Sequence, residues 1–356
     1  MVSFMLRGFE RKPSTVRRSE MGPLYYTNLP GGTYRFDMQI EDALGRNSKT
    51  MVTTIIKAKA FYEQAWFFAL ALILFGGGSL GLLQLYVRNQ FKKIEKKHRD
   101  KAERERVISE LRMANQIQSG VLPHEFPPFP ERREFELFAM MEPAREVGGD
   151  FYDFFLIDDD HLCLVIADVS GKGIPAALFM MNTKVLIKSF ASGDNSPAEV
   201  LEIVNREICE NNQMEMFVTV WLGIMELSTG KVVAANAGHE YPVIGHAGEK
   251  FELIKDKHGF VIGGMEGMKY KDYELQLEPG DKLFVYTDGV PEAENTKNEM
   301  FGTERMLDAL NEEDYVPVEE LLRNVRKAVN EFAAGAEQFD DLTMLAVEYN
   351  GPEADQ

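Results

Sequence analysis

Residues 162–173 read LCLVIADVSGKG, an apolar run that ends abruptly in an aspartate and a polar, glycine-rich turn. The apolar run predicts a buried β-strand, and the residues from Asp168 to Gly173 predict a tight turn directly after it. A carboxylate at the end of a buried strand, next to flexible backbone, is a common arrangement for binding a cation or a polar ligand. Other carboxylates in similar places would complete such a site.

Three further segments place aspartate beside an apolar run or a glycine. They are Gly148-Gly149-Asp150, Thr287-Asp288-Gly289 and Asp340-Asp341-Leu342-Thr343. Each alone is more typical of an ordinary turn, as is Asp158-Asp159-Asp160; the set and its order along the chain carry the information. Aspartates gathered from strand ends supply the oxygen ligands that Mg²⁺ prefers, and two such ions about 3.5–4 Å apart activate water for attack on phosphorus.

The remainder of residues 126–350 predicts an α+β domain with antiparallel sheets. Apolar strand-like runs cluster between 217 and 254, with others near 136–141, 151–157, 282–286 and 342–347. Helices are expected over 174–190, after the capping box that begins at Ser196, and after Pro317.

These motifs, taken together, resemble the PPM-type (protein phosphatase 2C-like) serine/threonine phosphatases of the SpoIIE/RsbU branch. The resemblance covers about 225 residues and rests on ANQIQ at 114–118 with Leu122-Pro123, VGGDFYD at 147–153, IADVSGKG at 166–173, MFVT at 216–219, NAGH at 236–239, YTDGV at 286–290 and FDDLT at 339–343.

The resemblance implies a sandwich of two antiparallel β-sheets flanked by α-helices, with two Mn²⁺ or Mg²⁺ ions at one edge. It implies that Asp168 bridges both ions and that the main-chain carbonyl of Val169 binds one of them. Asp288 and Asp340 match ligands of the other ion, and Asp150 matches a carboxylate that orients metal-bound water. The matching positions with supporting roles are Asp341, Gly289 and Gly171.

Several residues keep two interpretations. Arg145 is either a phosphate contact or part of a surface ion pair, because its spacing from Asp150 is uncertain. His239 either faces the site or is a core histidine, and Lys172 meets either phosphate or solvent. Cys163 and Cys209 lie in apolar runs and match no nucleophile pattern, so we expect small core residues.

Residues 65–87, AWFFALALILFGGGSLGLLQLYV, predict one transmembrane helix. They carry no charge, and at about 1.5 Å per residue they span a bilayer core of about 30 Å. Residues 88–106 are rich in Lys and Arg, which places the following domain in the cytoplasm and residues 1–64 outside it. The expected location is thus the cell inner membrane, in a single pass.

Residues 1–64 resemble the small extracytoplasmic β-sandwich called the Y_Y_Y domain, through Leu6-Arg7-Gly8-Phe9 and through YTNLPGGTYRF at 26–36. That family usually carries a sensory propeller upstream, so the chain resembles a truncated receptor. Residues 88–125 predict a helical, coiled-coil signalling linker, with a homodimer expected through 88–122. The alternative is a charged helix with one face on the next domain. Residues 351–356 form a tail.

The net charge of −18 is unevenly distributed. Residues 1–125 hold 20 Lys and Arg against 12 Asp and Glu, whereas residues 126–356 hold 19 against 45. Such an acidic domain repels phosphate backbones, which argues against nucleic-acid binding and against a two-metal nuclease. The expected partner, by resemblance, is a phosphorylated STAS-type anti-sigma-factor antagonist. The alternative function is a receptor-like scaffold, or pseudophosphatase, that binds its partner without turnover.

Overall fold

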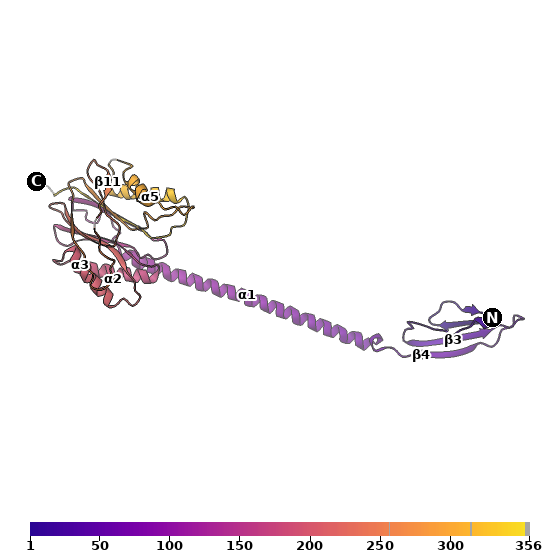
Figure 1. Ribbon diagram of the computed structural model, residues 1–356. Coiled ribbons are helices and arrows are strands. Elements are labelled where there is room, and N and C mark those ends of the chain that lie inside the picture. Colours follow the sequence, from indigo (N-terminus) through magenta and orange to yellow (C-terminus); the bar gives the residue numbers. More distant parts are fainter. Residues whose placement is uncertain (256, 314, 353–356) are drawn as a thin grey trace. The chain divides into compact units, whose positions relative to one another are not determined.

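The computed structural model describes residues 1–255, 257–313 and 315–352. These residues divide into two compact units, Met1–Ala102 and Glu103–Gln356. Figure 1 shows the elements of each unit.

The N-terminal unit contains one antiparallel sheet of four strands in the order β2-β1-β3-β4. Its strands are β1 (Val2–Arg7), β2 (Ser14–Val16), β3 (Gly32–Ile40) and β4 (Met51–Lys57), with short 3₁₀ turns at Arg18–Glu20 and Phe61–Glu63. The alternating side chains of β1 bury Val2, Phe4 and Leu6, as the two-residue period of a strand requires. Residues 1–64 therefore contain a single sheet, and the β-sandwich predicted for them is not confirmed.

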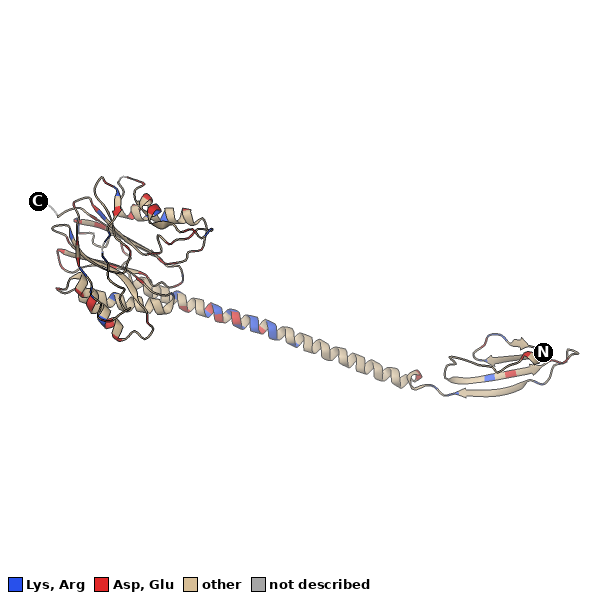
Figure 2. Ribbon diagram, in the orientation of Figure 1, with Lys and Arg blue, Asp and Glu red and all other residues tan. Residues whose placement is uncertain are grey.

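Helix α1 (Ala65–Val121) begins with the apolar segment and continues through the basic one (Figure 2). Its apolar side chains between Phe68 and Val87 are exposed, and α1 is the one helix among the described residues that is long and apolar enough to cross a membrane. This agrees with the predicted span, on length and composition.

The C-terminal end of α1, from Glu103 onward, belongs to the second unit and packs within it. Leu111, Ala114 and Val121 are half-buried there, and Gln118 is the buried residue of the helix. That part of the predicted apolar stripe covers the helix's own domain, as the alternative interpretation of the linker expected.

The second unit has two five-stranded antiparallel sheets, in the orders β11-β10-β13-β14-β5 and β12-β9-β8-β7-β6 (Figure 1). The strands are β5 (Phe135–Glu142), β6 (Phe151–Leu156), β7 (His161–Val169), β8 (Val218–Glu226), β9 (Lys231–Ala237), β10 (Val243–Gly245), β11 (Phe251–Leu253), β12 (Tyr273–Gln276), β13 (Lys282–Tyr286) and β14 (Leu342–Tyr349).

Three apolar cores separate four layers. The sheets pack on each other through one core, which includes Trp221 and Tyr349. Helices α2 (Ile174–Ala191) and α3 (Pro197–Glu210) cover the outer face of the β6–β9 sheet. Helices α4 (Gly302–Leu310) and α5 (Val318–Ala333) cover the other sheet. This confirms the predicted α+β sandwich of two antiparallel sheets flanked by helices.

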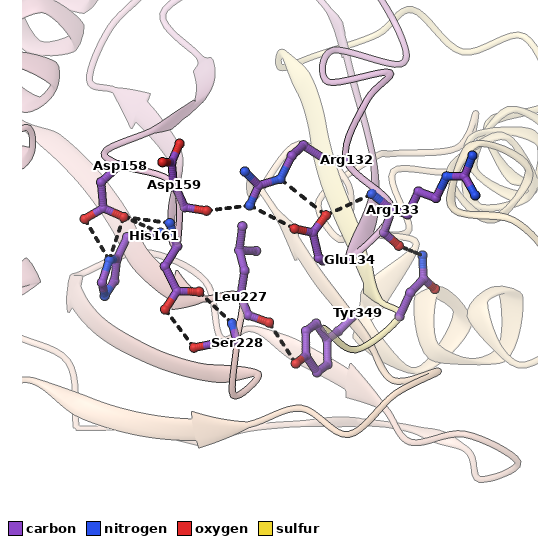
Figure 3. A network of polar contacts seen from close by, with 11 residues as sticks. Arg132, Arg133, Glu134, Asp158, Asp159, His161, Leu227, Ser228 and Tyr349 are labelled. Atoms are coloured by element: carbon purple, nitrogen blue, oxygen red, sulfur yellow. Dashed lines mark hydrogen bonds and ion pairs between the residues drawn. The ribbon is translucent and has the colours of Figure 1, made fainter. Parts of the chain in front are cut away.

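A polar network joins the two sheets at the β6–β7 turn (Figure 3). The Arg132 guanidinium, just before β5, donates to the Asp159 carbonyl at 2.5 Å. The Tyr349 hydroxyl, at the end of β14, donates to the Leu227 carbonyl at 2.9 Å. The acidic residues 158–160 thus form the turn that the sequence predicted, and they lie at the opposite ends of β6 and β7 from Asp150 and Asp168.

Candidate active site

Two of the predicted carboxylates lie at one end of the β6–β7 hairpin. Asp150 directly precedes β6, and Asp168 is the penultimate residue of β7. The pairing of Phe151 with Ala167 places both aspartates at the same end of the two strands. Antiparallel pairing therefore brings together residues that belong to separate motifs.

The other two carboxylates come from the second sheet. Asp288 follows β13 and Asp340 precedes β14. Tyr286 pairs with Met344, so the end of β13 lies beside the start of β14. The two sheets then pack with these ends close together, because the Thr287 hydroxyl donates to Asp150 Oδ2 across the interface at 2.7 Å.

Asp341 organises the loop before β6. Its Oδ1 accepts from the Ala144 amide at 2.8 Å, and its Oδ2 accepts from the Gly149 amide at 2.7 Å and from the Asp150 amide at 3.4 Å. The side chain is buried, so each of these bonds to a charged acceptor is protected from water. Asp341 therefore holds the backbone of the loop that leads into Asp150.

Glycine is required at three points around these carboxylates, at two of them because the backbone approaches closely. A Cβ on Gly149 would lie 2.8 Å from the Val169 carbonyl oxygen, and one on Gly289 would lie 1.9 Å from the Asp341 carbonyl oxygen. Gly171 has a φ of +85°, which L side chains rarely adopt. The motifs therefore need glycine for space at Gly149 and Gly289 and for backbone conformation at Gly171.

The carboxylates repel one another in a partly desolvated setting. Burial raises the pKa of Asp168 to about 6, with the charges of Asp340 and Asp341 adding to the effect. Burial, then the charges of Asp168 and Asp340, raises the pKa of Asp288 to about 7. The pKa of Asp150 is raised well above its usual range by burial and by the neighbouring charges of Asp168 and Asp341. Carboxyl groups in this condition favour a nearby cation.

The chemistry of this donor set fits hard divalent ions. The available atoms are carboxylate and main-chain oxygens, which Mg²⁺ and Mn²⁺ prefer. Because residue 149 is a glycine, no Cβ at that position crowds the Val169 carbonyl oxygen. Within the described parts of the chain, no three His, Cys, Asp or Glu side chains form a ready metal cage.

Comparison with known proteins identifies the family. The profile of the family described as Stage II sporulation protein E (SpoIIE) matches residues 158–350, more than half of the chain. The chain belongs to the SpoIIE family. The matched range includes Asp168, Asp288 and Asp340, while Asp150 lies just before it.

Several individual relatives agree with this assignment. Protein IcfG of Synechocystis sp. is 32% identical over 302 residues, which are 77% of this chain and 46% of IcfG. Phosphoserine phosphatase RsbU of Bacillus subtilis is 27% identical over 241 residues, covering 68% of this chain and 70% of RsbU. This chain therefore spans less than half the length of IcfG.

A solved structure supports the fold. The SiaA-PP2C domain of Pseudomonas aeruginosa aligns with a TM-score of 0.62 at 23% identity, covering 70% of this chain and 99% of that domain. A PPM-type phosphatase fits both this fold and the names of the SpoIIE-family relatives.

Two cationic residues that the sequence singled out have different surroundings in this SpoIIE-family domain. Lys172 forms an ion pair with Asp340, at 3.0 Å between Nζ and Oδ2. Arg145 is exposed and has no hydrogen bond or ion pair to any other described residue. The lysine, not the arginine, therefore lies among the predicted metal ligands.

His239 is a core histidine. It is buried, its Nδ1 lies 2.8 Å from the Thr219 hydroxyl, and its amide donates to Asn236 Oδ1 at 2.7 Å. Burial lowers the pKa of His239 to about 3, so the ring is neutral at neutral pH. Thr219 is the β8 residue that pairs with Asp168 of β7, so His239 contacts the strand next to the one that carries the acid. Cys163 is likewise fully buried, as predicted, whereas Cys209 is only partly buried.

Two residues gained a role only from the structure. Thr287 fixes the orientation of Asp150. The Gln118 amide of α1 donates to the Gly148 carbonyl at 2.7 Å and accepts from the Gly148 amide at 3.2 Å. Both lie within motifs quoted from the sequence, yet nothing in the motifs says what these side chains contact.

Proposed function

We propose that the protein is a metal-dependent protein phosphatase that hydrolyses phosphoserine or phosphothreonine on a regulatory protein. The observation that supports this most strongly is the meeting of Asp150 and Asp168 from one sheet with Asp288 and Asp340 from the other, in a SpoIIE-family fold. The charges of Asp168 and Asp340 contribute to the raised pKa of Asp288, which supports this arrangement.

The proposed reaction is direct hydrolysis. A water oxygen bonds to phosphorus, the bond from phosphorus to the serine oxygen breaks, and that oxygen takes up a proton. Two Mn²⁺ or Mg²⁺ ions, when bound, supply the positive charge that acidifies water and neutralises phosphoryl oxygens. Asp168, the Val169 carbonyl, Asp288 and Asp340 are the residues that would hold them.

We assign Asp150 the role of orienting the water. Thr287 fixes one of its carboxyl oxygens by donating a hydrogen bond, and Asp341 Oδ2 accepts hydrogen bonds from the Gly149 and Asp150 amides. A carboxyl group held in this way next to Asp168 is positioned to accept a hydrogen bond from water. No phospho-enzyme is required.

The membrane arrangement is also a proposal. We infer a single pass through the cell inner membrane by residues 65–87, with residues 1–64 extracytoplasmic and the phosphatase domain cytoplasmic. The exposed apolar side chains of this part of α1 and the basic residues 88–106 that follow support it.

The proposed partner is a phosphorylated STAS-type anti-sigma-factor antagonist, and this rests on the family resemblance. We also propose a homodimer through residues 88–122. Because the face of α1 that contains Leu111 and Gln118 covers the helix's own domain, pairing would use the exposed apolar residues. These are Val107, Ile108, Met113 and Ile117, and farther along the helix Phe91 and Ile94.

The test is phosphate release from a phosphoserine peptide by the full chain in detergent micelles, with and without Mn²⁺. We expect manganese-dependent turnover that falls about 100-fold or more in Asp168→Asn. Asp194→Asn removes the same charge at an exposed position and should leave turnover unchanged. A folded, manganese-binding chain whose turnover is equally absent in wild type and Asp168→Asn would favour the scaffold.

A further inference from the structure

Lys172 makes three contacts at the edge of the candidate active site. Its ammonium lies 3.0 Å from Asp340 Oδ2, donates to the Phe339 carbonyl at 2.6 Å, and lies 4.1 Å from the centre of the Phe339 ring. The side chain keeps 27% of its exposure. It is therefore held in a defined place while remaining open to solvent on one side.

The turn that presents Lys172 is conformationally specialised. Gly171 and Gly173 have φ values of +85° and +83°, and a Cβ on either would meet no atom within 4 Å. Glycine is thus needed at both positions for backbone conformation and not for space. The turn leaves β7 directly after Val169 and places the lysine between the β7 end and the loop before β14.

The local charge balance makes this ammonium unusual. Its positive charge acts on Asp168 as well as on Asp340. A phosphoserine dianion that approaches these carboxylates is repelled by their negative charge. A positive group beside them would offset that repulsion. In the described part of the chain, Lys172 is the cation whose contacts include a predicted metal ligand.

We propose that Lys172 binds the phosphoryl group of the substrate. Until a divalent ion binds the Asp340 carboxylate, that carboxylate pairs with the Lys172 ammonium and keeps it from phosphate. This deepens the proposed phosphatase function and rests on it. A carboxylate that serves a divalent ion no longer neutralises the ammonium, and the flexible lysine chain can then turn to an incoming phosphate. Lysine suits the role because it acts as a point charge on phosphate oxygens.

The proposal predicts that removing the Lys172 charge strengthens Mn²⁺ binding and weakens phosphate binding, both measured on the full chain in micelles. In Lys172→Gln, Asp340 loses its competing cation, so we expect Mn²⁺ to bind about three- to tenfold more tightly in isothermal titration calorimetry. The same variant, loaded with Mn²⁺, should bind inorganic phosphate at least about tenfold more weakly. In peptide hydrolysis kcat/KM should fall by a similar factor, chiefly through a higher KM.

A matched control is Lys250→Gln. Lys250 is exposed in the β10–β11 turn, beside the Lys282 end of β13 and so at the other end of that strand from Asp288. Lys250→Gln removes the same charge and should change neither the Mn²⁺ affinity nor the phosphate affinity. Lys172→Arg keeps the charge and should recover much of the phosphate affinity. Circular dichroism and thermal unfolding establish that each variant is folded.

The other outcomes overturn the proposal. Weaker Mn²⁺ binding in Lys172→Gln would make the lysine a positioning residue for Asp340. Unchanged phosphate affinity would show that Lys172 does not contact phosphate, whatever the change in Mn²⁺ affinity. Because both readouts are equilibrium measurements, they decide the role of Lys172 even if the peptide is not hydrolysed, while the Asp168→Asn comparison decides the phosphatase function itself.

Discussion

Gln118 connects α1 to the loop that carries Asp150, and Gln118→Ala tests that connection. The side-chain amide makes two hydrogen bonds to one residue, at 2.7 Å to the Gly148 carbonyl and 3.2 Å from the Gly148 amide. Both partners are buried. The substitution leaves a backbone donor and a backbone acceptor unpaired, two residues before the proposed water-orienting carboxylate.

The magnitude follows from these two bonds. A neutral hydrogen bond contributes about 1 kcal/mol net, and leaving a buried partner unpaired costs about 1–3 kcal/mol. Water entering at the helix surface offsets part of this, so we expect a loss of about 2–3 kcal/mol for the pair. For a domain of this size that is a fall in Tm of roughly 4–12 °C.

The effect on activity should exceed the effect on folding at the assay temperature. Gly148 and Gly149 position the Asp150 amide, so a loosened loop displaces the carboxylate from its place beside Asp168. A displacement of about 1 Å costs on the order of 100-fold in rate. We therefore expect kcat with a phosphoserine peptide to fall by about tenfold or more, well below the unfolding temperature.

The control is Gln116→Ala, the same chemical change two residues earlier on an exposed part of α1. Thermal unfolding and phosphate release would be measured for both variants of the full chain in micelles. If Gln118→Ala matches Gln116→Ala in Tm and in kcat, the glutamine does not couple the helix to the site and the reasoning above is wrong.

Two further substitutions test the electrostatics of the fold. Asp341→Ala unpairs buried amides from a charged acceptor, so we expect a loss of about 3–4 kcal/mol in thermal unfolding; Asp341→Asn, which keeps one oxygen, should lose about half of that, and equal losses would contradict the assignment. His246 Nδ1 lies 2.7 Å from Asp281 Oδ2, and this hydrogen bond raises the pKa of His246. A raised pKa contributes stability that is present below the unfolded pKa and is lost as pH rises through the folded one. His246→Gln should therefore lower the free energy of unfolding more at pH 5.5 than at pH 8.5, with a difference of about 0.5 kcal/mol at most for this half-exposed pair; a pH-independent loss in thermal unfolding would disprove the linkage.

The short, apolar runs bounded by turn residues predicted antiparallel sheets, and the family resemblance implied that two such sheets form a sandwich. The sequence did not predict elements whose local signals are weak. Strand β12 (Tyr273–Gln276) has only two inward positions, and helix α4 (Gly302–Leu310) starts after Phe301 without a side-chain cap. The N-terminal domain differs from its prediction for another reason. The family resemblance implied a sandwich, whereas residues 1–64 form one sheet.

The site shows where reading a sequence stops. Strand ends and glycines pointed to the aspartates, because a buried strand that ends in a carboxylate is a local pattern. The contacts that distinguish their roles are not local: Asp341 reaches the Gly149 amide across 192 residues, and Lys172 reaches the Phe339 carbonyl across 167. Such contacts exist only once the two sheets have packed, because each motif supplies one partner of each pair. The same dependence means that whatever shifts α1 against Gly148 acts first on the Asp150 end of the site, and reaches Asp288 and Asp340 only through the contacts of Thr287 and Asp341. A signal transmitted through α1 is therefore expected to act on the orientation of water by Asp150 before it acts on the metal ligands of the second sheet.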